Sequence, residues 1–207
     1  MSITTIGPHR VQHGNIMDGI DALMQGEKAD LVYSDPPWGQ GNLSYWQTMN
    51  TKMTGVPKLA LSLTDFLDAV LTAIATYAQG YVLLEYGCQW RSKFIEAVET
   101  YDLQHYDTVT PSYRSGDGLR PYDLHLFGVL GTLPIKLDPA IASNHGIAVV
   151  RAAVPPLAVE GGILLDPCCG LGLMAQVAME NGMRFRGNEI NGKRLQETIV
   201  KLEKGTK

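Results

Sequence analysis

The sequence has little of what marks a secreted, metal-binding or membrane protein. Its 207 residues include only three cysteines, Cys88, Cys168 and Cys169, and their spacing fits neither a zinc site nor a disulfide framework. No apolar run approaches the length of a membrane span, and the N-terminus has no basic segment followed by an apolar one. We therefore expect reduced thiols, no metal, no membrane partner and a cytoplasmic location.

Internal repeats and low-complexity stretches are also missing, so we expect one domain over residues 1–207, without a separate target-recognition domain. Hydrophobic residues make up 45% of the chain and charged residues 18%, which is typical of a globular protein. The net charge is −4. This is unusual for a protein that grips duplex nucleic acid, because neutralised phosphates supply most of the non-specific affinity. Such a function needs a local basic surface, a partner subunit or weak binding.

Short β-branched or aromatic runs alternate with helical patterns, which predicts a doubly wound, mostly parallel α/β sheet. The clearest helix begins at a capping box formed by Ser62 and Asp65. Residues 39–61 show no clear periodicity and are expected to be irregular. Seven strands are predicted, with an antiparallel pairing between the fourth and fifth: 10–13, 30–34, 81–85, 103–110, 122–129, 162–165 and 183–187.

The segment Asp35-Pro36-Pro37-Trp38 directly follows a predicted buried strand, where open α/β sheets bind ligands. The exocyclic amine of a nucleobase is a poor nucleophile, because its lone pair is delocalised into the ring, and acceptors for its hydrogens favour its attack. An ionised Asp35 only accepts hydrogen bonds, and the stiff Pro-Pro backbone fixes the Pro36 carbonyl. Trp38 offers a face for base stacking, at about 1–3 kcal/mol per base. A proline-rich turn capped by Asp35 is the simpler alternative.

A second motif, Asp166-Pro167-Cys168-Cys169-Gly170-Leu171-Gly172, lies between a predicted strand and a helix. Its glycines permit positive φ and close approach of the backbone to a ligand. Glu189 ends the next predicted strand, where an acid can hydrogen-bond both ribose hydroxyls of an adenosine. The motif is not G-x-G-x-x-G, which disfavours a nicotinamide cofactor. A structural turn, with Glu189 capping the last helix, is the alternative.

The two motifs, in this order, resemble the β-class amino-methyltransferases of nucleic acids, chiefly the N6-adenine DNA methyltransferases, over nearly the whole chain. In that family a D-P-P-[YFW] motif precedes D-P-F-x-G-x-G. The resemblance implies S-adenosylmethionine as cofactor and a seven-stranded Rossmann-like methyltransferase sheet, mostly parallel with one antiparallel strand. It also implies a circularly permuted motif order, in which the first predicted strand lies beside the strand ending at Glu189. Aspartate at position 35 is typical of the adenine enzymes, whereas the cytosine-N4 enzymes more often carry serine.

The resemblance extends to other cofactor contacts. His13-Gly14-Asn15 is similar to the segment that reaches the cofactor adenine, and Ser143-Asn144-His145-Gly146 stands where the family often has Lys-Pro near the cofactor carboxylate. Pro167-Cys168 also looks like the Pro-Cys nucleophile of cytosine-C5 enzymes, but it lies in the cofactor turn, so we reject that role. The implied cofactor site comprises Asn15, Asp35, Asn144, His145, Asp166, Pro167, Cys168, Gly170, Gly172, Glu189 and Asn191.

Two segments, 39–61 and 111–122, are free to contact a target, and the second contains a predicted turn at Asp117-Gly118. Both combine aromatic with basic residues, which suits an extruded nucleotide and its phosphates; an ordinary solvated surface is the alternative. Neither is long enough for a target-recognition domain. We therefore expect little or short sequence specificity, or recognition by a partner subunit, and the resemblance is compatible with a homodimer. The expected substrate contacts are Trp38, Asn42, Tyr45, Trp46, Tyr113, Arg114 and Arg120.

These observations predict an enzyme that methylates N6 of adenine in DNA, as in restriction-modification systems, with Asp35, Pro36, Pro37 and Trp38 as its catalytic residues. Methylation of adenine N6 in RNA and of cytosine N4 in DNA are alternatives within the same class. A non-catalytic cofactor-binding subunit is disfavoured because both motifs are intact. A small-molecule methyltransferase is disfavoured because it needs no clamp for a base amine.

Overall fold

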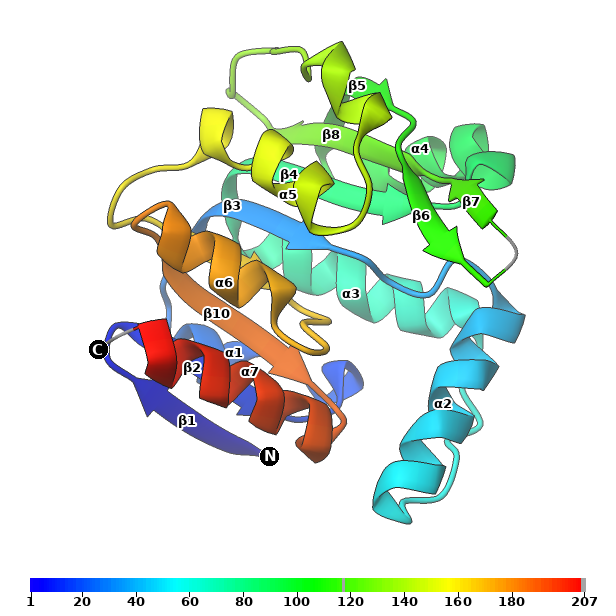
Figure 1. Cartoon of the computed structure of the whole chain (residues 1–207), viewed down its shortest axis with the longest axis vertical. Coiled ribbons are helices and arrows are strands. Elements are labelled where there is room, and N and C mark those ends of the chain that lie inside the picture. The colour runs from blue at the N-terminus through cyan, green and yellow to red at the C-terminus, as the bar shows by residue number, and fades with distance from the viewer. Residues whose placement is uncertain (117, 206–207) are drawn as a thin grey trace.

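The computed structural model describes residues 1–116 and 118–205 (Figure 1); Asp117 of the predicted turn lies outside them. An eight-stranded sheet forms the centre of the molecule, and a separate ribbon consists of β6 (Ser112–Ser115) and β7 (Gly118–Pro121). The order of the strands in the sheet is β1 (Ser2–Ile6), β2 (His9–His13), β10 (Arg184–Glu189), β9 (Ile163–Asp166), β3 (Ala29–Ser34), β4 (Ala78–Tyr86), β8 (Asp123–Val129) and β5 (Leu103–Val109).

The sheet is mostly parallel, as predicted. Strands β2, β10, β9, β3 and β4 run in the same direction, and the antiparallel pairing of β5 with β8 is confirmed. Val11 pairs with Gly187, so the first predicted strand does lie beside the strand ending at Glu189. The expected count of seven strands, one of them antiparallel, is wrong. The additional strand, β1, pairs antiparallel with β2 at the sheet edge, and it is short and partly exposed, so it has no buried apolar run to recognise.

Helices cover both faces of the sheet and bury its apolar residues (Figure 1). None of the helices in the described ranges has the length and apolarity that a membrane crossing requires. One face of the sheet packs against α5 (Ile147–Ala153), α6 (Leu173–Glu180) and α7 (Gly192–Gly205), and the other against α1 (Asp21–Met24), α3 (Leu63–Tyr77) and α4 (Arg91–Glu99). Short 3-10 turns occur at Ile16–Asp18, Cys88–Trp90, Pro139–Ser143 and Pro155–Leu157.

The expectation that residues 39–61 are irregular is wrong, because they contain the 15-residue helix α2 (Gln40–Thr54). This helix buries only Leu43, so it lacks the apolar stripe from which amphipathic helices are recognised. Gly55 ends it in the left-handed conformation, with φ of +77°. The capping box ahead of α3 is confirmed, since the Asp65 backbone N–H donates to Ser62 Oγ at 3.0 Å.

Three arginines converge on Glu27, which follows α1. Arg184 Nη1 and Arg186 Nη2 lie 2.6 and 2.8 Å from its carboxylate oxygens, and Arg10 also pairs with it. Arg186 is 3% exposed, and burial lowers its pKa to about 10. The Glu27 carboxylate therefore compensates a group of cations at the amino ends of β2 and β10, opposite the edge where the motifs lie.

We expect Glu27→Ala to lower the free energy of unfolding by about 2–4 kcal/mol, because removing one partner leaves buried charges uncompensated. Urea denaturation measures the change. Glu96→Ala, on the exposed side of α4, is the matched control and should stay within about 0.5 kcal/mol of the wild type. Equal stabilities of the two variants would contradict the role given to Glu27.

Candidate active site

The candidate active site lies at the carboxyl ends of four consecutive parallel strands, β10, β9, β3 and β4. Each carries an acidic residue at that end: Glu189, Asp166, Asp35 and Glu85. Burial raises the pKa of all four, to about 6 for Asp35 and to about 8 for Asp166 and Glu85. The negative charge of Asp35 contributes to the upward shifts at Glu85 and Asp166. Such a row of carboxyl groups is suited to a ligand that brings positive charge.

Asp35 is exposed although its chain neighbours Ser34 and Pro36 are buried. Desolvation by the surrounding atoms nevertheless raises the pKa of its carboxyl group. Trp38 Nε1 donates to Asp35 Oδ1 at 2.9 Å, which fixes the side chain and leaves Oδ2 available. With a pKa of about 6, Asp35 is ionised to about nine-tenths at neutral pH. The motif therefore presents a fixed hydrogen-bond acceptor.

Trp38 belongs to an aromatic cluster beside Asp35. Its ring stacks on Tyr122, with centroids 5.6 Å apart and planes 23° apart, and contacts Tyr113 edge to face, also at 5.6 Å. Tyr113 comes from the ribbon, where it pairs with Arg120 across the two strands. The structure thus brings together two of the expected substrate residues, Trp38 and Tyr113. It also shows that the buried Tyr122 supports Trp38, a contact that the sequence did not indicate.

Glu85 is a candidate site residue that the sequence did not indicate. Tyr33 Oη donates to Glu85 Oε1 at 2.5 Å, and Tyr122 Oη donates to the same oxygen at 3.4 Å. Ser34, the last residue of β3, pairs with Leu84, so Asp35 follows β3 at the level of Glu85, and the charge of Asp35 acts on the Glu85 carboxyl group. The acid at the end of the run Tyr81–Glu85 was the available signal, but its position beside Asp35 depends on a pairing between distant segments.

The glycine turn after β9 is hydrogen-bonded to Glu189. Gly170 N–H donates to Glu189 Oε2 at 2.9 Å, and Asn191 N–H donates to Oε1 at 2.8 Å. Gly170 and Gly172 have φ of +52° and +74°. A Cβ atom on Gly170 would have no neighbour closer than 4.0 Å, whereas one on Gly172 would lie 2.6 Å from Thr198 Oγ1. Gly170 therefore leaves room for a ligand, and Gly172 permits α7 to pack against the turn.

Asn15 lies next to this corner, because Gly14 N–H donates to the Glu189 carbonyl at 3.1 Å. Asn15 Oδ1 accepts from Met17 N–H at 3.2 Å, and the residue lines a hollow of about 350 Å³. Asn191 has a structural role, since its Oδ1 accepts from the Lys193 and Arg194 N–H groups at 3.0 and 3.1 Å and so caps α7. The alternative was that Glu189 caps the last helix; in the structure Asn191 Oδ1 caps it, and Glu189 accepts from the Asn191 N–H. The hollow beside Asn15 is lined by Met1, Ser2, His13, Gly14, Asn15, Asp18 and Ile190.

The other expected cofactor residues lie either beside the ribbon or within the glycine turn. His145 Nδ1 is 2.8 Å from Ser112 Oγ, which places Asn144 and His145 beside the ribbon. Pro167 is buried within the glycine turn. Burial and the nearby Asp166 hold the pKa of the Cys168 thiol well above its usual value. A neutral thiol is a poor nucleophile, in keeping with the rejection of a covalent role for Cys168.

The expected contacts Asn42, Tyr45 and Trp46 all lie on α2. Trp46 contacts the Tyr45 ring, with centroids 5.1 Å apart, and lies under the Arg194 guanidinium of α7 at 4.3 Å. In the described part of the chain, the ring contacts of these two residues are not with Trp38. The aromatic residues expected to contact the target are therefore divided between the Trp38 cluster and α2.

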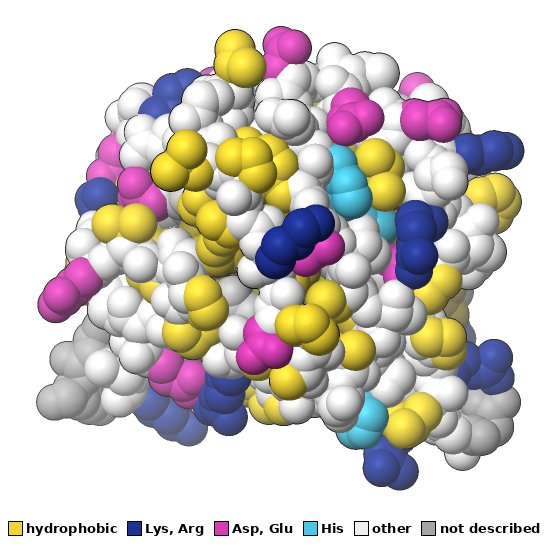
Figure 2. Space-filling model, turned by 90° about the horizontal axis from the view of Figure 1, so that it is seen from above, with side chains coloured by type: hydrophobic (Ala, Val, Ile, Leu, Met, Phe, Trp, Pro, Cys, Tyr) yellow, Lys and Arg dark blue, Asp and Glu magenta, His cyan; other side chains and the backbone are white. Residues whose placement is uncertain are grey.

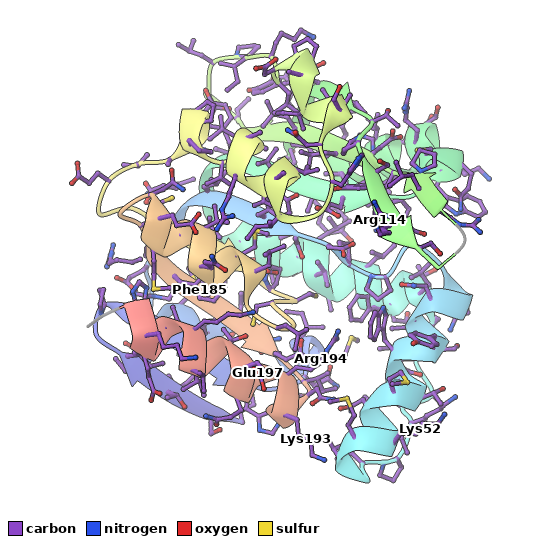
Figure 3. All side chains as sticks on the ribbon, in the orientation of Figure 1. Lys52, Arg114, Phe185, Lys193, Arg194 and Glu197 are labelled. Atoms are coloured by element: carbon purple, nitrogen blue, oxygen red, sulfur yellow. The ribbon has the colours of Figure 1, made fainter. Side chains whose placement is uncertain are left out.

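Basic side chains gather between α2 and α7. Figure 3 shows Lys193 and Arg194 at the amino end of α7, across from Lys52 on α2, and Arg114 on the ribbon. In contrast, basic and acidic side chains are interspersed on the face shown in Figure 2. A chain with a net charge of −4 thus has a local basic region near its candidate site. It includes a hollow of about 360 Å³ lined by Met53, Leu171, Lys193, Arg194, Glu197 and Lys201.

The chain has an α/β fold with a mostly parallel sheet, and the solved structures that share this fold include DNA methyltransferases. The M1.HpyAVI complex with SAM has a TM-score of 0.63 at 14% identity, covering 93% of this chain and 98% of that one. TTHA0409 from Thermus thermophilus, provisionally described as a DNA modification methylase, was solved with S-adenosyl-L-methionine and has a TM-score of 0.61 at 13% identity, covering 95% and 94%. PvuII DNA methyltransferase, described as cytosine-N4-specific, has a TM-score of 0.63 at 10% identity, covering 98% and 91%.

At these identities the comparisons establish a shared fold. No protein-family model matches the chain, and no curated protein matches it either.

Proposed function

We propose that this chain transfers a methyl group from S-adenosylmethionine to N6 of adenine in DNA. The main support is the position of the Asp35–Trp38 motif and the glycine turn at the ends of neighbouring strands, β3 and β9. The donor set suits the cofactor, because the open side of Gly170 leaves space and Glu189 has lone pairs left for ribose hydroxyls. S-adenosylmethionine also carries sulfonium and ammonium charges, which the ionised Asp35 carboxylate would attract.

In this proposal, Asp35 Oδ2 and the Pro36 carbonyl accept the two hydrogens of the target amine. The cofactor supplies an electrophilic methyl group. The nitrogen lone pair forms the new N–C bond as the C–S bond breaks, with inversion at carbon, and the surplus proton on nitrogen passes to Asp35. Trp38 and Tyr113 hold the extruded base by ring contacts. Positioning and electrostatics carry the reaction, without a covalent enzyme intermediate.

We propose adenine and not cytosine as the target base because position 35 is aspartate, the residue typical of the adenine enzymes that the chain resembles. Cytosine N4 is the second candidate, since a similar structure, that of the PvuII enzyme, is described as specific for it. DNA is proposed as the polymer because two of the similar structures are described as acting on DNA. The formation of a homodimer and recognition of the target by a partner subunit stay predictions.

Product analysis tests the proposal. The protein is incubated with methyl-labelled S-adenosylmethionine and, separately, with duplex DNA, single-stranded DNA and RNA, and the digested nucleosides are identified. We expect label in N6-methyldeoxyadenosine. Label in N4-methyldeoxycytidine would replace the proposal with the second candidate, and label confined to RNA would contradict DNA as the substrate.

The basic region between α2 and α7 is expected to contact the phosphate backbone. Replacing Lys193 with glutamine should lower the magnitude of the slope of log affinity against log salt by about 1, as expected for one lost phosphate contact. Lys93→Gln, on the exposed surface of α4, is the matched control and should leave the slope unchanged. Fluorescence anisotropy with labelled DNA measures both, and equal slopes for the two variants would remove this region from the DNA interface.

A further inference from the structure

Glu85 is held in one orientation by two tyrosines. Tyr33 and Tyr122 both direct their hydroxyl groups at Oε1, and no hydrogen bond between Oε2 and another side chain occurs in the described ranges. Tyr33 is 1% exposed and Tyr122 2%, so both come from the rigid core under the site. The second oxygen of Glu85 is therefore free to interact with a ligand held beside Asp35.

We propose that Glu85 is a specificity-determining residue, which stays protonated and donates a hydrogen bond from Oε2 to the ring nitrogen next to the target amine. The inference rests on the proposed function. A base whose amine is clamped by Asp35 presents its Watson–Crick edge to the same group of strand ends. On that edge, the atom next to the amine is N1 in adenine and N3 in cytosine, and both are acceptors. Guanine carries a hydrogen at N1, so its N1–H donor would face the O–H donor of Glu85 and the two could not form a hydrogen bond.

The surroundings of Glu85 keep its proton in place at neutral pH. The groups that face it are Tyr33 of β3, Tyr122 before β8, and the carboxyl groups of Asp35 and Asp166. Burial and the negative charge of Asp35 raise the pKa of Glu85 to about 8, although the tyrosine hydrogen bonds oppose the shift. The proton is therefore present below that pH and is lost as the pH rises through it. Two neighbouring carboxyl groups thus have opposite roles, one accepting and one donating.

This role concerns positioning of the base. A hydrogen bond to the ring nitrogen withdraws electron density from the amine, so it does not accelerate the attack itself. Its loss should appear in KM for the target base, with kcat changed little. Above the pKa of Glu85, the carboxylate would face the lone pair of the ring nitrogen, and KM should rise with pH. Glutamine at this position keeps a donor that does not titrate.

The test compares wild type, Glu85→Gln and Glu85→Leu from about pH 6.5 to 9.5, with DNA containing adenine or 1-deazaadenine, which lacks the ring acceptor, at the methylated position. With adenine we expect Glu85→Leu to raise KM by about 10- to 100-fold, the range for an unsatisfied polar group. Glu85→Gln should stay near the wild type at neutral pH and should lack the rise in KM at alkaline pH. With 1-deazaadenine, the difference between wild type and Glu85→Leu should vanish, because a double-substitution cycle isolates the contact.

The outcomes separate this inference from the proposed function. An equal effect of Glu85→Leu with both bases, or an alkaline rise in KM that persists in Glu85→Gln, would overturn the role of Glu85 while methyl transfer stands. Failure of the wild type to methylate any base would overturn the proposed function, and this inference with it. If a variant does not fold, the wild type alone decides, since its preference for adenine over 1-deazaadenine should disappear as Glu85 ionises.

Discussion

Asp35→Ala is expected to lower kcat for methyl transfer by about 10²–10³-fold, the usual cost of removing one preorganised group that stabilises a transition state. The carboxylate is fixed by Trp38, so the enzyme does not have to reorganise it during the reaction. The dissociation constant of S-adenosylmethionine, measured by calorimetry, should change by less than about tenfold, because Asp35 is one of several acidic groups near the turn. Transfer that persists at the wild-type rate would refute the amine clamp.

Asp35→Asn should be nearly as damaging as Asp35→Ala, although asparagine has almost the same shape. Trp38 Nε1 donates to Oδ1, so the amide oxygen of asparagine would remain with Trp38 and its NH₂ group would face the target amine. Two donors would then meet. Combining Asp35→Asn with Trp38→Phe frees the amide to rotate and should restore part of the lost rate. Absence of any rescue in this pair would show that the Trp38 hydrogen bond does not set the orientation at position 35.

The Asp35 carboxylate should also determine how kcat/KM for methyl transfer falls at acidic pH. Burial raises the pKa of Asp35 to about 6, and only the ionised form accepts both a Trp38 and an amine hydrogen bond. The ratio kcat/KM should therefore be nearly constant between this pH and the pKa of Glu85, about 8, and should fall about tenfold per unit below about pH 6.

The sequence predicted those parts of the fold whose burial appears in local patterns. The strand before Asp35 and the strand before Asp166 are short apolar runs that are buried in the sheet, and α3 is indicated by its capping box and apolar repeat. Helix α2 and strand β1 bury too little to produce a pattern. Both were missed because they are stabilised by a neighbouring element more than by an apolar face of their own.

The candidate site was predictable where one motif contains the chemistry. Asp35 and Trp38 are close in sequence, and Glu189 follows a recognisable strand, so each could be named in advance. Glu85 could not, because its importance comes from its strand pairing with β3. Asn191 has a role that the sequence analysis did not name, since its side-chain oxygen caps α7; its contact with the cofactor stays a prediction.

Glu189→Ala is expected to weaken S-adenosylmethionine binding by about 10²-fold, in the range for a lost charged hydrogen-bonding group. Both oxygens of Glu189 hold backbone N–H groups, of Gly170 and Asn191. The substitution therefore removes the ribose acceptor and also releases the glycine turn. Glu189→Gln should fail as well, because its amide NH₂ would have to face one of these N–H donors. Glu197→Gln, on the exposed side of α7, is the matched control and should bind the cofactor like the wild type.

A ribose-modified cofactor separates the two effects of losing Glu189. If the carboxylate binds the ribose, the wild type should bind 2′-deoxy-S-adenosylmethionine more weakly than the natural cofactor, by about tenfold for one hydrogen bond to a charged group. Glu189→Ala should bind both cofactors equally, since it has no acceptor for the missing hydroxyl. A variant that still distinguishes them would show that the ribose is recognised elsewhere and that Glu189 serves only to shape the turn. Calorimetric titration of the two cofactors into the two proteins gives the four affinities that decide between these roles.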